Sequence, residues 1–221
     1  MAFIRQISSF VWTRTMTSTA PAAFNQKKRI FTLWLLATIF LAVFIFCSPL
    51  WGDDSGIHGV IETLGIGLVF AAILGRLWSI LYIGARKNEE LVTIGPYSMT
   101  RNPLYVFSLI GIAGIGLMFG SIILTVLLVT ACTVVFYYTS LREAAFLRGK
   151  FGSVYDAYAA STPLMLPRFS AYRSAAEVTF SQKALTTTFL DCLFLLALFP
   201  IIEGVEYLQT SGYLPVFFHI P

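Results

Sequence analysis

Uncharged hydrophobic segments of helical length recur along the chain and are separated by shorter polar stretches. The first, 30–51, has 22 positions without a charge, enough to cross a hydrocarbon core that needs about 20 helical residues. The second, 63–84, is interrupted only by Arg76, and the last, 184–202, contains Asp191 and is predicted to end near Pro200. Each of these segments predicts one membrane-spanning helix.

The segment 104–140 differs because its 37 uncharged positions are too many for one span. At about 1.5 Å of rise per residue, a single helix of this length would overshoot the membrane. Two short helices that turn near Gly120-Ser121 and form a tight hairpin fit better, and Gly111, Gly114 and Gly116 have spacings that allow close helix approach. The predicted fold class is therefore all-α, a polytopic membrane protein with about five transmembrane helices.

The composition supports a membrane protein. Apolar residues make up 57% of the chain and charged residues 12%, whereas soluble domains have about 45–50% and about 25%, and the mean hydropathy is +0.78. This balance excludes a disordered chain, a disulfide scaffold and a nucleic-acid module. Cys47, Cys132 and Cys192 lie in apolar runs and are expected to be buried free thiols. His58 and His219 are far apart in the sequence, so we expect no metal site.

The charges indicate an orientation for the five predicted spans. Arg and Lys gather before residue 30, between 86 and 101, and between 142 and 183, whereas the stretch 52–62 and the end after 202 carry only acidic charges. Apart from Arg76, every basic residue then lies on one side of a five-span arrangement. Since cytoplasmic loops are enriched in Lys and Arg, the N-terminus is predicted to be cytoplasmic and the C-terminus external.

The first 29 residues contain a Ser- and Thr-rich stretch with scattered apolar positions and two arginines, Arg5 and Arg14. This stretch lacks the continuous apolar core of a secretory signal. One interpretation is an amphipathic segment that lies on the cytoplasmic face of the membrane, and the other is a mitochondrial transit peptide.

Two polar connections, 85–101 and 141–183, adjoin the predicted hairpin and are expected to meet at its cytoplasmic mouth. A pocket there would touch lipid on one side and the cytosol on the other. This position suits an enzyme that joins a soluble cosubstrate to a membrane-embedded one. Phe146, Phe151, Val154, Tyr155 and Tyr158 have helix-like spacing in the second connection and predict an interfacial helix.

Four polar residues near the predicted spans are candidates for function. Asn102 is expected to cap a helix that starts at Pro103. Glu143 directly follows an uncharged span and is expected to pair with an arginine or with the amine or hydroxyl groups of a ligand. Arg76 lies inside a predicted span. A charged residue there either has a function or extends its side chain to the lipid headgroups. For Asp191 we favour an interhelical hydrogen bond.

The polar connections also carry two ordered motifs. The first reads Arg76-Leu77-Trp78, Gly84, Leu91-Val92-Thr93-Ile94-Gly95-Pro96-Tyr97 and Arg101-Asn102-Pro103-Leu104-Tyr105, and the second contains Glu143, Leu147, Phe151-Gly152, Tyr155, Tyr158 and Leu166-Pro167-Arg168. With a hairpin between them, these motifs resemble the isoprenylcysteine carboxyl methyltransferase family and its phospholipid N-methyltransferase relatives. The resemblance covers about 62–170.

The resemblance implies methyl transfer from S-adenosylmethionine, bound by cytoplasmic loops, to a membrane lipid or a prenylated small amphiphile. It implies the following cofactor-binding residues: Glu89, Glu90, Leu91, Val92, Gly95, Tyr97, Asn102, Pro103, Leu104, Tyr105 and Glu143. Arg101 and Glu143 are the expected catalytic residues, and Arg76, Trp78 and Arg142 the expected substrate contacts. Displacement at a sulfonium methyl group needs alignment and exclusion of water, but no metal.

The motifs depart from the family pattern at three positions. Asn102 stands where the family has His, Ala144 replaces the second Glu of a pair, and Thr139 replaces an arginine that contacts substrate in the eukaryotic prenylcysteine enzymes. Two alternatives stay open. One is a membrane reductase of the steroid-reductase type, since those enzymes share a similar hairpin motif but use NADPH. The other is a non-catalytic membrane scaffold, which Asn102 and Ala144 make conceivable.

The resemblance and the predicted spans together suggest a division of the chain. The expected parts are a cytoplasmic N-terminal segment (1–29), a first transmembrane helix with its external loop (30–61), a methyltransferase core (62–170) and a C-terminal loop with a transmembrane helix (171–221). The motif variant is bacterial in type, so the expected location is a bacterial inner membrane.

Overall fold

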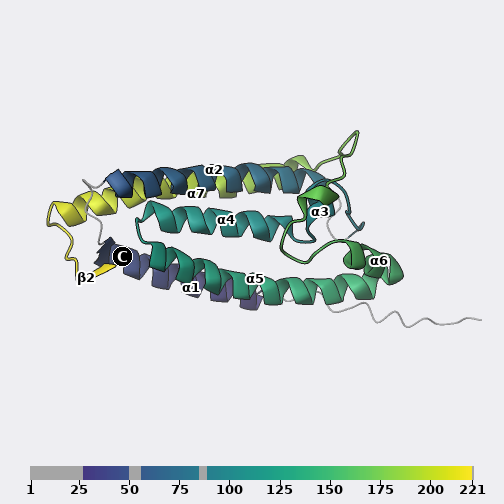
Figure 1. Ribbon diagram of the computed structural model, residues 1–221, viewed down its shortest axis with the longest axis horizontal. Coiled ribbons are helices and arrows are strands. Elements are labelled where there is room, and N and C mark those ends of the chain that lie inside the picture. The colour runs from purple at the N-terminus through teal and green to yellow at the C-terminus, as the bar shows by residue number, and fades with distance from the viewer. Residues whose placement is uncertain (1–26, 50–55, 85–88, 221) are drawn as a thin grey trace, which may run out of the picture.

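The computed structural model describes residues 27–49, 56–84 and 89–220, so the predicted N-terminal amphipathic segment lies almost wholly outside the described residues. Long helices run side by side along the molecule, and the short elements gather at its two ends (Figure 1). The long helices are α1 (Lys27–Phe46), α2 (Gly56–Ile83), α4 (Pro103–Met118), α5 (Ile122–Phe151) and α7 (Gln182–Thr210). The short elements are β1 (Cys47–Pro49), α3 (Pro96–Met99), α6 (Ser153–Ser161), the 3-10 turn η1 (Phe169–Ala171) and β2 (Phe218–Ile220).

Among the described residues, three helical segments are long and apolar enough to cross a membrane, judged by length and composition: Gly59–Ile83, Ile122–Phe151 and Gln182–Thr210. The segments Phe31–Phe46 and Pro103–Met118 are also apolar but shorter. The chain is therefore a mostly helical membrane protein. The count of five spans and the cytoplasmic N-terminus stay predictions.

Helices α2 and α4 approach closely because glycines face each other between them. A Cβ atom added to Gly114 would lie 2.6 Å from the carbonyl oxygen of Gly65, and one added to Gly65 would lie 2.7 Å from the carbonyl oxygen of Gly114. A Cβ atom on Gly111 would lie 3.1 Å from Ala72. The close approach predicted from the glycines of 104–120 is confirmed, although its partner Gly65 was not foreseen.

The break between α4 and α5 falls at 119–121, and the two helices lie side by side (Figure 1). Gly120 turns the chain with a positive φ of 80°, which costs glycine little. The Ser121 side chain accepts a hydrogen bond from the Leu124 amide at 3.2 Å and so begins α5.

Helix α5 does not end near 140 but continues to Phe151, so the predicted loop from Leu141 is wrong in its first part. The continuation contains Leu, Arg, Glu and Ala, which favour helix. Gly152, with a φ of 55°, then breaks the chain before α6. The predicted single interfacial helix is therefore also wrong, because its residues are divided between α5 and α6. Tyr155 and Tyr158 are buried, with exposed fractions of 1% and 8%.

Helix α7 passes through Pro200 and ends at Thr210, so the predicted end near Pro200 is wrong. Proline is tolerated inside membrane helices, where neighbouring groups can satisfy the freed carbonyl. Asp191 is exposed and forms no hydrogen bond with the described part of the chain. The expected interhelical bond is wrong because Thr188 and Cys192, one turn apart, occupy the buried face of α7.

At the end of the molecule opposite α3, the segment after α1 pairs with the segment after α7. Strands β1 and β2 pair in parallel, with Cys47 opposite Phe218 and Ser48 opposite His219. The Gln209 side-chain amide donates to the carbonyl oxygens of Phe44, Ile45 and Cys47 at 3.3, 2.9 and 3.2 Å. The three cysteines are buried free thiols, as predicted.

Candidate functional site

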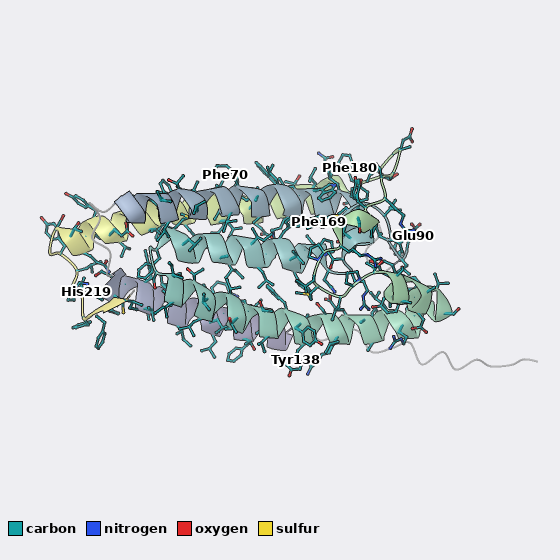
Figure 2. All side chains as sticks on the ribbon, in the orientation of Figure 1. Phe70, Glu90, Tyr138, Phe169, Phe180 and His219 are labelled. Atoms are coloured by element: carbon teal, nitrogen blue, oxygen red, sulfur yellow. The ribbon has the colours of Figure 1, made fainter. Side chains whose placement is uncertain are left out.

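A cavity of about 590 Å³ lies where α4 begins, and it is lined by side chains of α1, α2, α4 to α7 and the segment 90–102. Figure 2 labels Glu90 at this end of the molecule. Its lining includes most of the residues that the motifs predicted: Arg76, Glu90, Leu91, Val92, Tyr97, Arg101, Asn102, Pro103, Leu104, Tyr105 and Glu143. Ligand cavities in proteins measure about 300–1,000 Å³, so this one can hold a small molecule.

Gly95 does not line the cavity, but its backbone positions the helix α3, which does. Its φ is 61°, and a Cβ atom would lie 2.3 Å from the ring of Tyr82. Its amide donates to the carbonyl oxygen of Arg173 at 2.8 Å, and its carbonyl oxygen accepts from the Ser98 hydroxyl at 2.7 Å. This arrangement starts the short helix α3 at Pro96, with all four helical residues buried.

Tyr97 of α3 lines the cavity and is buried. Its carbonyl oxygen accepts a hydrogen bond from the Tyr158 hydroxyl at 2.7 Å. Its own hydroxyl is buried and has no hydrogen-bond partner in the described part of the chain. Burial, and after it the charges of Tyr158 and Glu143, raise the pKa of Tyr97 well above its ordinary value. The Tyr97 hydroxyl is therefore a neutral donor that a ligand could use.

Asn102 occupies the N-cap position of α4, but its side chain makes no capping hydrogen bond, so that prediction is wrong. The Asn102 side-chain amide instead donates to the carbonyl oxygen of Leu164 at 2.9 Å. The neighbouring Arg101 amide donates to the carbonyl oxygen of Pro163 at 2.9 Å. These bonds tie the start of α4 to the chain that follows α6, and they fix the wall formed by 102–105.

Glu143 of α5 meets Tyr105 of α4 across the cavity wall. The Tyr105 hydroxyl donates to Oε1 of Glu143 at 2.8 Å. The Tyr105 ring stacks on Phe136, with centroids 4.9 Å apart and an interplanar angle of 10°. The carboxylate expected from the second motif is therefore held by a residue of the first motif.

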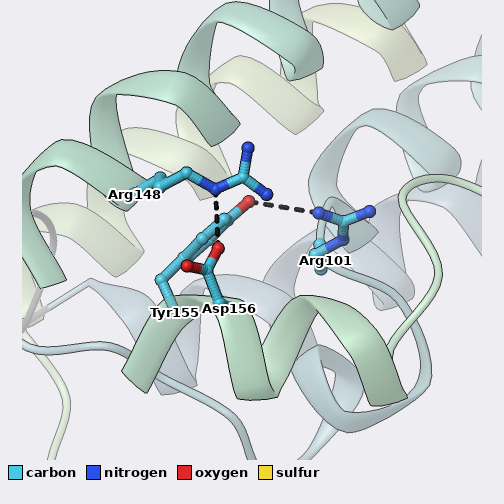
Figure 3. A network of polar contacts seen from close by, with 4 residues as sticks. All are labelled: Arg101, Arg148, Tyr155 and Asp156. Carbon is cyan, nitrogen blue, oxygen red and sulfur yellow. Dashed lines mark hydrogen bonds and ion pairs between the residues drawn. The ribbon is translucent and has the colours of Figure 1, made fainter. Parts of the chain in front are cut away.

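Arg101 points toward α6 at the same cavity. Its Nη1 donates to the Tyr155 hydroxyl at 3.2 Å (Figure 3). Its Nε is buried and has no hydrogen-bond partner in the part of the chain that the structure describes. Arg148 and Asp156, also drawn in Figure 3, form an exposed ion pair of 2.6 Å that is absent from the cavity lining. Exposed pairs of this kind contribute little to stability.

Arg76 places a positive charge in the wall formed by α2. It lies seven residues before the last residue of α2, or about 10 Å along the helix at 1.5 Å per residue. One amino group donates to the Ser108 hydroxyl of α4, while Nε is buried without a partner among the described residues. Apolar side chains from three helices line the same cavity: Leu33, Ile80 and Phe136.

Four predicted residues do not line the cavity. Glu89 and Arg142 are exposed, and Gly95 acts through its backbone. Trp78 packs instead against Phe107 and Tyr172, with ring centroids 6.4 and 5.9 Å apart.

The cavity also contains polar residues that the sequence did not single out. Ser108 lies one turn after Leu104 and could have been found from helical spacing. Ser140 lies one turn before Glu143 on α5 and could have been found in the same way. Thr188 carries no such signal, because it comes from α7, which is distant in sequence.

The charges of the cavity come from Arg76, Arg101, Glu90 and Glu143. This mixture suits a ligand with both positive and negative groups, while the apolar side chains can accept a lipophilic one. In residues 27–49, 56–84 and 89–220 no group of three or more His, Cys, Asp or Glu side chains could hold a metal ion.

The chain matches one family model and is similar to two metal-resistance proteins. The sequence model for phospholipid methyltransferases matches residues 60–154. The chain is 34% identical to the nickel-cobalt-cadmium resistance protein NccN of Alcaligenes xylosoxydans xylosoxydans over 199 residues. This alignment covers 90% of this chain and 92% of the relative. It is 35% identical over 191 residues to the cobalt-zinc-cadmium resistance protein CzcN of Cupriavidus metallidurans, which covers 86% of this chain and 88% of the relative. No solved structure matches.

Proposed function

The chain belongs to the family of membrane methyltransferases that includes the phospholipid and isoprenylcysteine enzymes, and from this membership we propose that it transfers a methyl group from S-adenosylmethionine to a lipophilic acceptor. The observation that carries the proposal is the 590 Å³ cavity, whose wall combines the 90–105 segment with Glu143. S-adenosylmethionine would supply a methyl group activated on a sulfonium.

The polar wall of the cavity fits the amino-acid part of S-adenosylmethionine. The buried Arg101 Nε and the Tyr97 hydroxyl are donors without partners among the described residues, and they suit a carboxylate. The Glu143 carboxylate, oriented by Tyr105, suits an ammonium group. The segment 90–92 would bind the remainder of the cofactor. Glu143 is also the nearest candidate base if the acceptor is an amine.

The acceptor would lie toward the apolar part of the cavity. Leu33, Ile80 and Phe136 are suited to its hydrocarbon portion, and Arg76 with Ser108 to an oxygen of its polar end. Thr139 is buried, bonds to the carbonyl oxygen of Val135 and does not line the cavity. No side chain at that position is available to take over the role of the prenylcysteine enzymes' arginine. This favours a membrane lipid or quinone-like acceptor over a prenylated protein.

Titration of S-adenosylmethionine into the full-length protein in an uncharged detergent tests the proposal. We expect saturable binding by calorimetry and, with added membrane lipid extract, transfer of the labelled methyl group to an extractable lipid. NADPH titrated in parallel should give no saturable heat. A folded protein that binds NADPH but not S-adenosylmethionine would replace this proposal with the reductase alternative.

The names of the two relatives suggest a physiological context for the reaction. We infer that methyl transfer by this chain contributes to tolerance of nickel, cobalt or cadmium ions by changing a membrane component. In a strain that lacks the gene, the wild-type gene should restore growth at raised metal concentration, whereas a Glu143→Gln gene should not. Full restoration by Glu143→Gln at equal protein levels would show that tolerance does not depend on methyl transfer.

A further inference from the structure

A second cavity, of about 370 Å³, lies beside α3 and belongs to neither motif's expected ligand site. Helix α3 contributes to both cavities, since Tyr97 lines the first and Ser98 the second. The polar lining of the second cavity consists of two arginines and five hydroxyl-bearing residues: Arg168, Arg173, Ser98, Ser161, Thr162, Ser170 and Tyr172. Among the described residues no acidic side chain lines it. Its charge is therefore positive.

Hydrogen bonds hold the backbone around this cavity, while most guanidinium donors of its two arginines make no hydrogen bond with the described residues. The Arg173 amide donates to the Ser98 hydroxyl at 2.9 Å, and the Arg173 carbonyl oxygen accepts from Gly95. The Arg173 guanidinium forms no hydrogen bond or ion pair within the described part of the chain. Arg168 donates through Nη2 to the carbonyl oxygen of Ser161 at 2.6 Å, and its other guanidinium donors remain available. Two such guanidinium groups in one cavity suit the oxygens of a phosphate.

Apolar side chains beside these arginines point to a lipid as the source of that phosphate. Leu166 and Phe169 have exposed fractions of 83% and 75%, and Tyr172 is also exposed. They lie in the connection between α6 and α7, outside the helices that could span the membrane. Figure 2 places Phe169 at the end of the bundle that carries α3 and α6. Membrane-spanning helices end at the interface where headgroups meet acyl chains, and arginine and aromatic residues are favoured there.

We propose that the second cavity binds the headgroup of an anionic phospholipid, with Arg168 and Arg173 donating to the phosphate and with Leu166 and Phe169 in the adjoining acyl region. Because Ser98 is part of this site and Tyr97 part of the first, the bound lipid would brace α3 between the two cavities. The lipid is distinct from the methyl acceptor, and its binding requires neither cofactor nor reaction.

The test compares thermal unfolding of the full-length protein in an uncharged detergent with and without short-chain phosphatidylglycerol. We expect the lipid to raise the Tm by several degrees in the wild-type protein, since a ligand that binds only the folded state stabilises it. Arg173→Gln should keep the wild-type Tm without lipid, because the guanidinium makes no bond in the described chain, and should lose at least half of the shift. Arg148→Gln, which removes an arginine outside the cavity, should keep the whole shift. Arg173→Lys should give an intermediate shift, because lysine keeps the charge but not the bidentate donors.

Three results would overturn the proposal. An equal shift in Arg173→Gln and wild type would place the lipid elsewhere. An equal shift with inorganic phosphate alone would identify a free-anion site. An equal shift with short-chain phosphatidylcholine would show that the net charge of the headgroup is not recognised.

Discussion

Replacement of Glu143 by glutamine is expected to lower kcat/KM for methyl transfer by at least about a hundredfold and to weaken S-adenosylmethionine binding by tenfold or more. Glu143 accepts a hydrogen bond from Tyr105 in the cavity wall, and glutamine keeps the size but loses the charge. Loss of one partner of a buried charged interaction costs about 2–5 kcal/mol, and every 1.4 kcal/mol is about tenfold in affinity. Initial rates and calorimetry on the same preparations measure both effects.

Tyr105→Phe and Glu203→Gln complete this experiment. Tyr105→Phe keeps the ring that stacks on Phe136 but removes the donor to Glu143. A hydrogen bond to a charged group contributes about 1.5–3 kcal/mol, so this variant should lose activity by about ten- to a hundredfold, less than Glu143→Gln. Glu203 is exposed near the far end of α7, and its replacement should have no effect. If Glu143→Gln and Glu203→Gln had equal activity, Glu143 would have no role in cofactor binding.

Replacement of Gly65 by alanine is expected to lower the Tm by about 5–10 °C and to reduce methyl transfer as well. The new Cβ atom would lie 2.7 Å from the carbonyl oxygen of Gly114 and 2.8 Å from the amide nitrogen of Met118. Both are backbone atoms, so α2 and α4 would have to separate. Overpacking of this kind costs about 1–3 kcal/mol, and in a chain of this size each kcal/mol shifts the Tm by about 2–4 °C. Activity falls because these helices carry Arg76 and Tyr105 to the cavity.

Gly67→Ala is the matched control on the same helix. A Cβ atom on Gly67 would meet nothing within 4 Å, and alanine favours helix over glycine by about 1 kcal/mol. The Tm of Gly67→Ala should therefore stay constant or rise. Equal losses in the two variants would mean that glycine itself, and not the close contact of α2 with α4, sets stability at both positions.

The hydrophobic segments located the long helices because a run without charges is visible in the sequence itself. The end of α5 was missed because helix-forming residues continue after the apolar run, so only Gly152 stops the helix. Pro200 was taken as a helix end because proline removes a backbone donor, yet α7 continues through it. The pattern of polar and apolar residues alone therefore does not locate the C-terminal ends of α5 and α7.

The candidate cavity was predictable where the motifs contain its residues in consecutive positions, as in 102–105. The two motifs were expected to meet at one end of the helices, but the sequence did not indicate that Tyr105 would contact Glu143. Ser98 and Arg173, by contrast, meet only through tertiary structure, so the second cavity left no pattern in the chain. Gly65 gave no signal for the same reason, since its contact lies on another helix.

The pairing of β1 with β2 limits how this protein could evolve. Helix α1, which supplies Leu33 to the cavity, precedes the family match at 60–154, and the segment that pairs with its extension follows that match. The segments before and after the family match are therefore joined to each other by the pairing of β1 with β2. A gene rearrangement that removed one of these segments would leave the other without its pairing strand, so the two are expected to be inherited, lost or exchanged together.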